Sequence, residues 1–265
     1  MYARIREYDA GMKGVLGVAA IDATSGRVFV YNGEAPFPTA SSIKIPIMIE
    51  LFRAASRGKF KMTDPVTVTE KEAVGGSGHL GAELKNGPRT MSVIALITLM
   101  IRDSDNTATN RAIAMAGMDR VNALVDELGF RTIRLRRIMM DSAAAQRSDE
   151  NTASPLEMAR LLEMLNAGKL AGAAETKQMI NVLKLVKAGM RRAVPETVEI
   201  ASKPGGIPGV ECEAGIVYLP GRPFIVSVFS TFIEDGKTPV TDVTRIVYDY
   251  FSTLARSNEY GHRVR

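Results

Sequence analysis

Ser41 and Lys44 combine the residue types and the spacing of a nucleophile and its base. If a helix begins at Ser41, the spacing of three puts the hydroxyl and the amine on one face of it, a turn apart. The residues that follow are apolar on nearly every face, which predicts a buried helix, and burial lowers the pKa of a lysine toward the range where it can accept the serine proton. The helix N-terminus would aim backbone N–H groups at an oxyanion formed there.

This pair alone is a weak signal. A serine that caps a helix beside a surface lysine has the same pattern, and Ser56 and Lys59 repeat the spacing within the chain. Gly58 would end a helix at this second pair, so Ser56 has neither burial nor a helix start. Other motifs must therefore decide between the two explanations.

The segment Ser104-Asp105-Asn106 follows an apolar run that predicts a helix over 92–101. A leaving nitrogen needs a proton, which the Ser104 hydroxyl could relay, while Asn106 could donate to the amide carbonyl of a substrate and steady Lys44. Junctions between helices favour the same residue types, so a purely local role for this segment stays open.

The segment Lys203-Pro204-Gly205-Gly206 ends a run with strand character. Lys203 could attract a substrate carboxylate, and Gly205 and Gly206 would let a substrate backbone approach closely. Two similar segments, 85–87 and 187–189, lie beside helical patterns and suit this role less well.

The composition argues against several other chemistries. The chain has 265 residues, of which 46% are hydrophobic and 24% charged, as is typical of soluble domains. Cys212 is the only cysteine, and His79 and His262 are the only histidines. We therefore expect no disulfide, no zinc centre, no Ser-His-Asp triad and no cofactor. The segment 75–79 lacks the second glycine of a nucleophile elbow and predicts a flexible loop.

The charge and the chain start limit the partners. The net charge is +5, but the basic residues are scattered among acids, and the one dense arginine cluster, at 131–137, has no aromatic neighbours for stacking. This favours a loop-pinning role for the cluster, and we expect no nucleic-acid partner. No apolar run is long enough for a membrane span, and the residues after Met1 lack the core of a signal peptide. We expect a monomer that stays in the cytoplasm or is exported and has lost its leader.

The elements that must position these residues follow from the hydrophobic pattern. A short helix over 1–8 precedes two strand-like runs, Gly14–Ala23 and Arg27–Asn32, which predict a hairpin. Helical periods follow from about residue 38 to 194. Strand character returns in Val198–Ser202, Glu211–Leu219 and Pro223–Phe232, and an amphipathic helix over 240–254 ends the pattern.

Strands at both ends with helices between them predict an α/β (α+β) fold. We expect an antiparallel sheet with flanking helices, built from residues 1–37 and 195–265, and an all-helical domain of residues 38–194 inserted between them. The active site is expected in the cleft between the two domains.

In this order and setting, the three motifs resemble the S-x-x-K, S-D-N and K-T-G set of class A β-lactamases and penicillin-binding proteins. The resemblance covers most of the chain and implies a β-lactamase/transpeptidase-like fold and a bacterial serine hydrolase acting on antibiotics. It implies that Ser41 attacks and that Lys44 acts as base, while Ser104 shuttles the proton. It also implies that Asn106 and Lys203 hold the substrate. The backbone N–H groups of Ser41 and Gly206 would form the oxyanion hole.

Two departures from the family pattern bear on the reaction. Pro204 stands where the family has Thr or Ser, so it offers neither a hydroxyl nor an N–H to a substrate carboxylate. The stretch 135–155 is shorter than the Ω-loop of class A enzymes, and Ile or Met occupies the place of the Glu that primes the deacylating water. Asp141 is the nearest acidic candidate for that role. Asp149 or Glu150 is expected to pair with Arg136 or Arg137 and close the loop.

These observations predict an acyl-enzyme on Ser41 that β-lactams form and that deacylates slowly. The short loop also resembles that of PBP-A-like relatives, which implies an alternative as a D-alanyl-D-alanine peptidase or small-ester hydrolase. The substrate would accordingly be a small β-lactam, peptide or ester. A catalytically silent binding protein is a third hypothesis, against which the intact motif residues argue.

Overall fold

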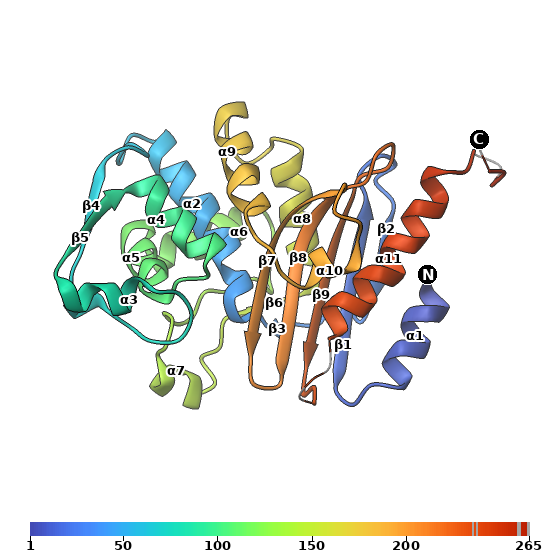
Figure 1. Cartoon of the computed structure of the whole chain (residues 1–265), viewed down its shortest axis with the longest axis horizontal. Helices are drawn as coiled ribbons and strands as arrows, with labels where there is room; N and C mark the ends of the chain where they lie inside the picture. The colour runs from blue at the N-terminus through green and yellow to red at the C-terminus, as the bar shows by residue number, and fades with distance from the viewer. Residues whose placement is uncertain (235, 237, 259–260, 264–265) are drawn as a thin grey trace. The chain divides into compact units, whose positions relative to one another are not determined.

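A computed structural model describes residues 1–234, 236, 238–258 and 261–263, and the chain forms two compact units (Figure 1). The sheet unit comprises Met1–Ser42, Ala153–Ala167 and Lys187–Arg265, and the helical unit comprises Ile43–Thr152 and Gly168–Val186.

The sheet unit contains five antiparallel strands, in the order β2-β1-β9-β8-β7. They are β1 (Val15–Asp22), β2 (Val28–Tyr31), β7 (Glu199–Ile207), β8 (Val210–Tyr218) and β9 (Phe224–Thr231). The predicted hairpin is present as β1 and β2, and β1 pairs along its whole length with β9. The prediction of one antiparallel sheet built from distant parts of the chain is therefore confirmed.

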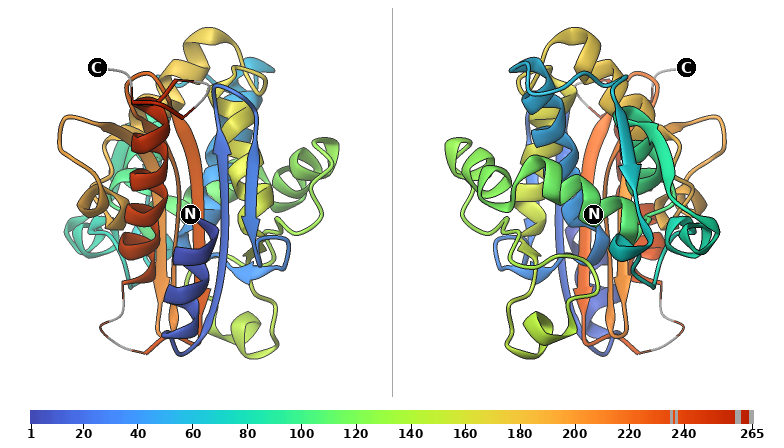
Figure 2. Two further views of the ribbon diagram at one scale, coloured as in Figure 1. Left: turned by 90° about the vertical axis from the view of Figure 1, so that its right-hand side faces the viewer. Right: turned by 90° about the vertical axis from the view of Figure 1, so that its left-hand side faces the viewer.

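Helices cover both faces of this sheet (Figures 1 and 2). The helices α1 (Tyr2–Ala10), α10 (Gly189–Ala193) and α11 (Pro239–Ala255) share one apolar core with one face, and α8 (Pro155–Asn166) packs on the other. Within the shared core, Phe224 of β9 stacks on Phe251 of α11 with ring centroids 4.4 Å apart. Because both faces are covered, nearly every residue of the central strands is buried.

The boundaries of the units differ from the predicted domains. The helices α8 and α10 were assigned to the helical domain, but both belong to the sheet unit. The apolar side of α8 includes Met158, Leu161 and Leu165 and lies against β1, β8 and β9. Helical periodicity shows that a helix has an apolar face but not which layer that face covers. The predicted cleft between domains stays a prediction.

The helical unit is arranged around one buried helix, α2 (Lys44–Ser56). Ten of its 13 residues are buried, as the apolar pattern predicted. Gly58, with φ of +77°, follows its end, so Ser56 lies in its last turn. Four helices contact α2: α4 (Val93–Arg102), α5 (Asn106–Ala116), α6 (Met118–Glu127) and α9 (Ala173–Lys184). Short elements complete the unit: η2 (Glu70–Glu72), α3 (Leu80–Glu83), η3 (Leu84–Asn86) and α7 (Ser142–Gln146).

The prediction that residues 38–194 are all-helical is wrong where short strands occur. The strands β4 (Pro65–Val68) and β5 (Arg89–Ser92) form a two-stranded antiparallel sheet, joined on one face by a 2.8 Å hydrogen bond between Thr67 and Thr90. The two strands are short and 20 residues apart, so neither stands out against the helical periods around it. Two further strands, β3 (Phe37–Pro38) and β6 (Thr152–Ala153), have two residues each. Among the described residues, no helix has the length and apolar character needed to cross a membrane.

Candidate active site

Lys44 is the centre of a hydrogen-bonded group in the helical unit. It is the first residue of α2 and is fully buried. Its Nζ donates to the Ser104 backbone oxygen at 2.7 Å, to Ser104 Oγ at 3.1 Å and to Asn106 Oδ1 at 3.2 Å. The structure thus brings together three of the residues that the motifs singled out, and it confirms the predicted contact of Asn106 with Lys44.

The turn that carries Ser104 is held in an unusual conformation. Ser104 has φ of +54°, which is uncommon for a residue with a side chain and is found more often at functional sites. The buried Asp105 beside it fixes the turn by capping α5, since its Oδ1 accepts from Ala108 N at 2.8 Å. Its Oδ2 accepts from the backbone N–H groups of His79 and Leu80, both at 2.8 Å.

The segment 75–79 is tied to this turn, although the sequence predicted a flexible loop. Asn106 N donates to Ser77 O at 3.0 Å, and Asn106 Nδ2 donates to Gly75 O at 3.1 Å. A Cβ at Gly78 would lie 2.2 Å from an Asp105 carboxylate oxygen, so only glycine allows this approach. The side chain of Asn106 is therefore oriented from both ends, by Lys44 and by this loop.

Ser41 belongs to the sheet unit and lies on a single 3-10 turn, η1 (Ala40–Ile43), that leads directly into α2. The predicted geometry was conditional on a helix that begins at Ser41, whereas the α-helix begins at Lys44. The tighter turn arises because Ser42 N donates to Thr39 O at 2.9 Å. Ala40, directly before Ser41, has φ of +41° and is strained. Ser41 itself is half-buried.

Strand β7 runs beside this serine turn within the sheet unit. A Cβ at Gly205 would lie 2.4 Å from Thr39 O and 2.8 Å from Ser41 N, so no side chain fits there. Gly206, the next residue, is exposed. The expected approach of a substrate backbone to Gly205 stays a prediction, and the backbone that approaches it in the structure is the chain's own serine turn.

Lys203 is fully buried in the same strand, and its Nζ donates to Pro204 O at 2.9 Å. Burial lowers the pKa of Lys203 to about 8, while the nearby Glu213 and Cys212 act in the opposite direction. Glu213 is also buried, and burial raises the pKa of its carboxyl. Pro204 disturbs the sheet little, because β7 is an edge strand.

Two residues beside Ser41 were missed by the sequence analysis. Ser42 Oγ donates to Thr39 O at 2.9 Å, and Cys212 Sγ lies 2.8 Å from Ser42 Oγ. Both side chains are buried. No spacing pattern links residues 170 positions apart, so only the pairing of β7 with β8 shows the connection.

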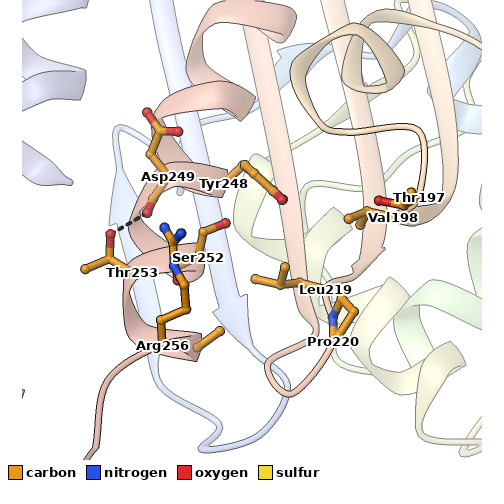
Figure 3. Close-up of a pocket in the computed structure, with 10 residues that line it drawn as sticks. Thr197, Val198, Leu219, Pro220, Tyr248, Asp249, Ser252, Thr253 and Arg256 are labelled. Atoms are coloured by element: carbon orange, nitrogen blue, oxygen red, sulfur yellow. Dashed lines mark hydrogen bonds between the residues drawn. The ribbon is translucent and has the colours of Figure 1, made fainter. Parts of the chain in front are cut away.

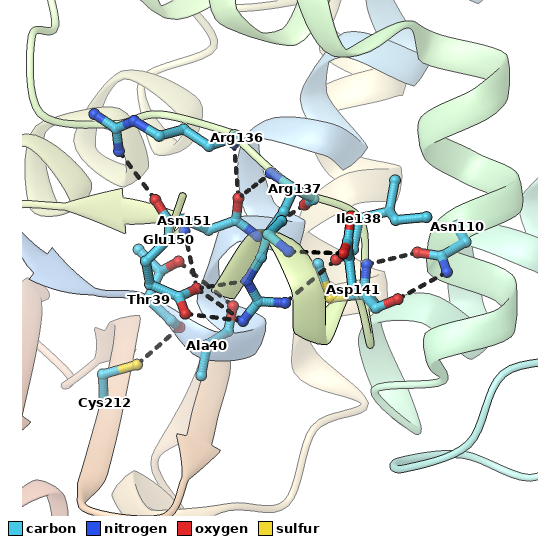
Figure 4. Close-up of polar contacts among 12 residues, drawn as sticks. Thr39, Ala40, Asn110, Arg136, Arg137, Ile138, Asp141, Glu150, Asn151 and Cys212 are labelled. Atoms are coloured by element: carbon cyan, nitrogen blue, oxygen red, sulfur yellow. Dashed lines mark hydrogen bonds and ion pairs between the residues drawn. The ribbon is translucent and has the colours of Figure 1, made fainter. Parts of the chain in front are cut away.

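The neck of the loop 135–155 is closed as predicted. Arg137 and Glu150 form two parallel bonds, Nε to Oε1 at 3.1 Å and Nη2 to Oε2 at 3.0 Å (Figure 4). Asn151 Oδ1 accepts from the backbone N–H groups of Arg136 and Arg137 at 2.8 and 3.0 Å. Asp149, the other predicted partner, pairs with Arg147 instead. The arginines at 136 and 137 thus pin the loop.

Inside the loop, Asp141 serves as the N-cap of α7, and its Oδ1 accepts from Ala144 N at 2.9 Å. Asn110 of α5 holds the backbone of the buried Met139, accepting from Met139 N at 2.8 Å and donating to Met139 O at 3.1 Å. The proposed deacylating role of Asp141 stays a prediction, and the bond of its carboxylate to Ala144 N is structural.

The sheet unit also contains a pocket away from these residues. A pocket of about 600 Å³ in the sheet unit is lined by α11 and by the residues just before β7 and just after β8 (Figure 3), and none of the predicted site residues is in its lining. Among the described residues, no group of three His, Cys, Asp or Glu side chains is arranged to hold a metal ion.

Comparison with known proteins identifies the family and the fold. The model of the beta-lactamase enzyme family matches residues 1–251. Beta-lactamase CTX-M-8 of Citrobacter amalonaticus is 27% identical over 237 residues, which cover 87% of this chain and 80% of that protein. The beta-lactamase structure from Sphaerobacter thermophilus superposes with a TM-score of 0.86 at 28% identity and covers 94% of this chain and 96% of its own.

The structure of PBP-A is similar in fold, with a TM-score of 0.86 at 23% identity and coverage of 94% of this chain and 95% of that one. The predicted β-lactamase/transpeptidase-like fold is thereby confirmed. The family match spans almost the whole sequence. The chain belongs to the beta-lactamase enzyme family, whose members are serine hydrolases of the β-lactam amide bond.

Proposed function

We propose that β-lactams acylate this protein on Ser41 and that the resulting acyl-enzyme is released slowly. The observation that carries the proposal is the buried Lys44, whose Nζ contacts Ser104 Oγ and Asn106 Oδ1. A buried amine held among neutral hydrogen-bonding groups, three residues after a serine, is suited to take the proton from that serine.

In the proposed acylation, Lys44 Nζ takes the proton of the Ser41 hydroxyl while Ser41 Oγ bonds to the β-lactam carbonyl carbon. The backbone N–H groups of Ser41 and Gly206 stabilise the oxyanion. When the C–N bond breaks, the proton passes through Ser104 Oγ to the leaving nitrogen, which leaves an ester on Ser41. A variant of the structurally similar PBP-A was solved as an acyl-enzyme complex with penicillin G, which supports this reaction in this fold.

Deacylation needs a base that activates water, and the loop 135–155 is poor in such groups. Its interior acid, Asp141, caps α7, and the positions before it are Ile138, Met139 and Met140. Without a well-placed carboxylate, the ester on Ser41 hydrolyses slowly. The slow step is thus assigned to this loop.

Intact-mass spectrometry during incubation with benzylpenicillin tests the proposal. The wild-type protein is expected to gain the mass of one penicillin within the time resolution of the experiment and to lose it slowly after the excess is removed. Ser41→Ala should show no adduct. Ser56→Ala is the matched control, because Ser56 and Lys59 share the spacing, and it should acylate like the wild type. An adduct that persists in Ser41→Ala would refute the assignment.

A second candidate function is that of a D-alanyl-D-alanine peptidase or small-ester hydrolase with the same nucleophile. The missing Glu of the short loop favours it, and Pro204, which offers no hydroxyl to a substrate carboxylate, favours the neutral ester in particular. Steady-state rates on benzylpenicillin, a D-alanyl-D-alanine peptide and a chromogenic ester distinguish the two. A high kcat on the penicillin with no turnover of the others would exclude this candidate. Family membership argues against a silent binding protein, and ester hydrolysis that is lost in Lys44→Ala would exclude it.

A further inference from the structure

Cys212 is buried on β8, next to the turn that carries Ser41. Its Sγ lies 2.8 Å from Ser42 Oγ, 3.0 Å from Thr39 O (Figure 4) and 3.5 Å from Gly205 O. It therefore touches the residues on either side of the Ala40–Ser41 pair and the strand beside them. All of these residues belong to the sheet unit.

The turn that Cys212 touches needs external support. Ala40 has φ of +41°, a left-handed conformation that is unfavourable for a residue with a Cβ. Such a conformation persists only where the surroundings impose it. Thr39 O accepts hydrogen bonds from Ser42 N and Ser42 Oγ, both at 2.9 Å, and from Cys212 Sγ at 3.0 Å. Together these bonds close the turn around Ala40 and Ser41.

The thiol suits this place in both chemistry and size. Burial raises the pKa of Cys212 to about 12, so the sulfur keeps its proton at neutral pH and can donate it. A Cβ at Gly205 would come within 2.8 Å of Sγ, so the sulfur fills the space between the serine turn and β7. A smaller side chain at position 212 would leave both the bond and the contact unmade.

We propose that Cys212 is a positioning residue that holds the Thr39–Ser42 turn against Gly205 and so fixes the direction of Ser41 Oγ and Ser41 N–H. The inference rests on the proposed function, in which Ser41 is the nucleophile and its N–H stabilises the oxyanion. Cys212 acts through this turn and does not touch the substrate.

Stopped-flow acylation with excess chromogenic β-lactam tests the role, because the rate constant counts only molecules that can react. Cys212→Ala is expected to lower it about tenfold, since small displacements of a nucleophile or an oxyanion donor are costly. Cys212→Ser should recover most of the rate, because a hydroxyl also donates to Thr39 O. Val217→Ala, a buried substitution in the same strand, is the matched control: it should lower the melting temperature but leave the rate constant within about twofold.

A wild-type rate constant in Cys212→Ala, with only a lower melting temperature, would overturn the proposal. If that variant does not fold, Cys212→Val takes its place, because valine fills the space but cannot donate to Thr39 O. A wild-type rate constant in Cys212→Val would again count against the proposal.

Amide hydrogen exchange separates this inference from the proposed function. The Ser42 N–H is bonded to Thr39 O, and its exchange is expected to accelerate at least fivefold in Cys212→Ala but not in Val217→Ala. If wild-type protein is never acylated, the proposed function fails, yet unchanged Ser42 exchange would still refute the positioning role.

Discussion

The lysine group and the loop 135–155 use polar side chains for opposite purposes. Around Lys44, the hydroxyl of Ser104 and the amide of Asn106 converge on one amine, and Asp105 fixes the turn that carries them. In the loop, the Arg137–Glu150 pair and Asn151 close the neck, and Asp141 caps a short helix. The first region is arranged around a reactive group and the second around its own backbone. In the proposed function, acylation depends on the first region and deacylation on the second, so the two steps can be altered separately.

Lys44→Met tests the group around Lys44 and should have the largest effect, which is on the acylation rate. Methionine keeps the apolar length but removes the amine, so the rate of acylation is expected to fall by about 10²- to 10⁴-fold, the usual contribution of a general base. Intact-mass kinetics with benzylpenicillin measure this rate. Lys59→Met, in the decoy pair, should not change it.

Met139→Glu tests the loop 135–155, because it supplies the carboxylate that deacylation is proposed to lack. Asn110 holds the backbone of Met139 on both sides, so a new side chain there starts from a fixed point. The deacylation rate is expected to rise about tenfold, less than the full contribution of a general base because the placement is not refined. Met140→Glu, at the exposed neighbouring position, is the control and should have little effect. Equal gains in both variants would show that any added charge suffices.

The pH dependence of the acylation rate tests whether charged Lys203 binds the substrate carboxylate. With a pKa of about 8, Lys203 loses its charge as the pH rises through that value. Acylation by a β-lactam with a carboxylate should therefore decline above about pH 8, approaching a tenfold fall per pH unit, relative to acylation by a neutral ester. Taking the ratio of the two acylation rates cancels the effect of other groups whose titration changes both rates. A ratio that stays constant to pH 10 would contradict a charged role for Lys203.

The same shift has a consequence for stability. The pKa of Lys203 lies below its ordinary value of 10.5, so between about pH 8 and 10.5 the unfolded chain binds the proton more tightly. Lys203 therefore destabilises the folded protein at neutral pH, and this penalty disappears as the pH rises through that window. The free energy of unfolding of the wild type should rise there relative to that of Lys203→Met.

Asp141 should give the smallest effect. Asp141→Ala is expected to lower the free energy of unfolding by about 1 kcal/mol through loss of the cap, and to change the deacylation rate less than twofold. Asp141→Asn keeps a capping oxygen and should behave like the wild type. A deacylation rate that falls tenfold in Asp141→Asn would assign the carboxylate a chemical role after all.

Much of the architecture was predictable because it follows from periodicity and order. The end strands, the buried α2 and the contact of Asn106 with Lys44 were all expected. The layer to which α8 belongs was not, because an apolar helix face packs equally well on a sheet or on helices. The short strands β4 and β5 were missed because tertiary pairing, and not local pattern, makes them strands.

The candidate site shows the same limit. Its motif residues are recognisable by type, but their supports are not. Cys212 and Ser42 are unremarkable in sequence, and Asn110 lies 29 positions from the backbone that it holds. The segment 75–79 looked unstructured because its partners are in another motif. These supporting contacts depend on which backbone segments lie side by side in the fold. The spacing of residues along the sequence does not show this.

The pairing of β1 with β9 also determines when the surroundings of Ser41 can form during folding. These two strands lie some 200 residues apart in the sequence. The turn that carries Ser41 packs against β7 and β8, and β8 pairs with the rest of the sheet through β9. Contacts this distant raise the contact order and slow folding. On the ribosome, the helical unit can emerge and collapse early, whereas the support beneath Ser41 must wait for the last strand. A nascent chain stalled before β9 is therefore expected to contain Ser41 and Lys44 and yet remain unreactive.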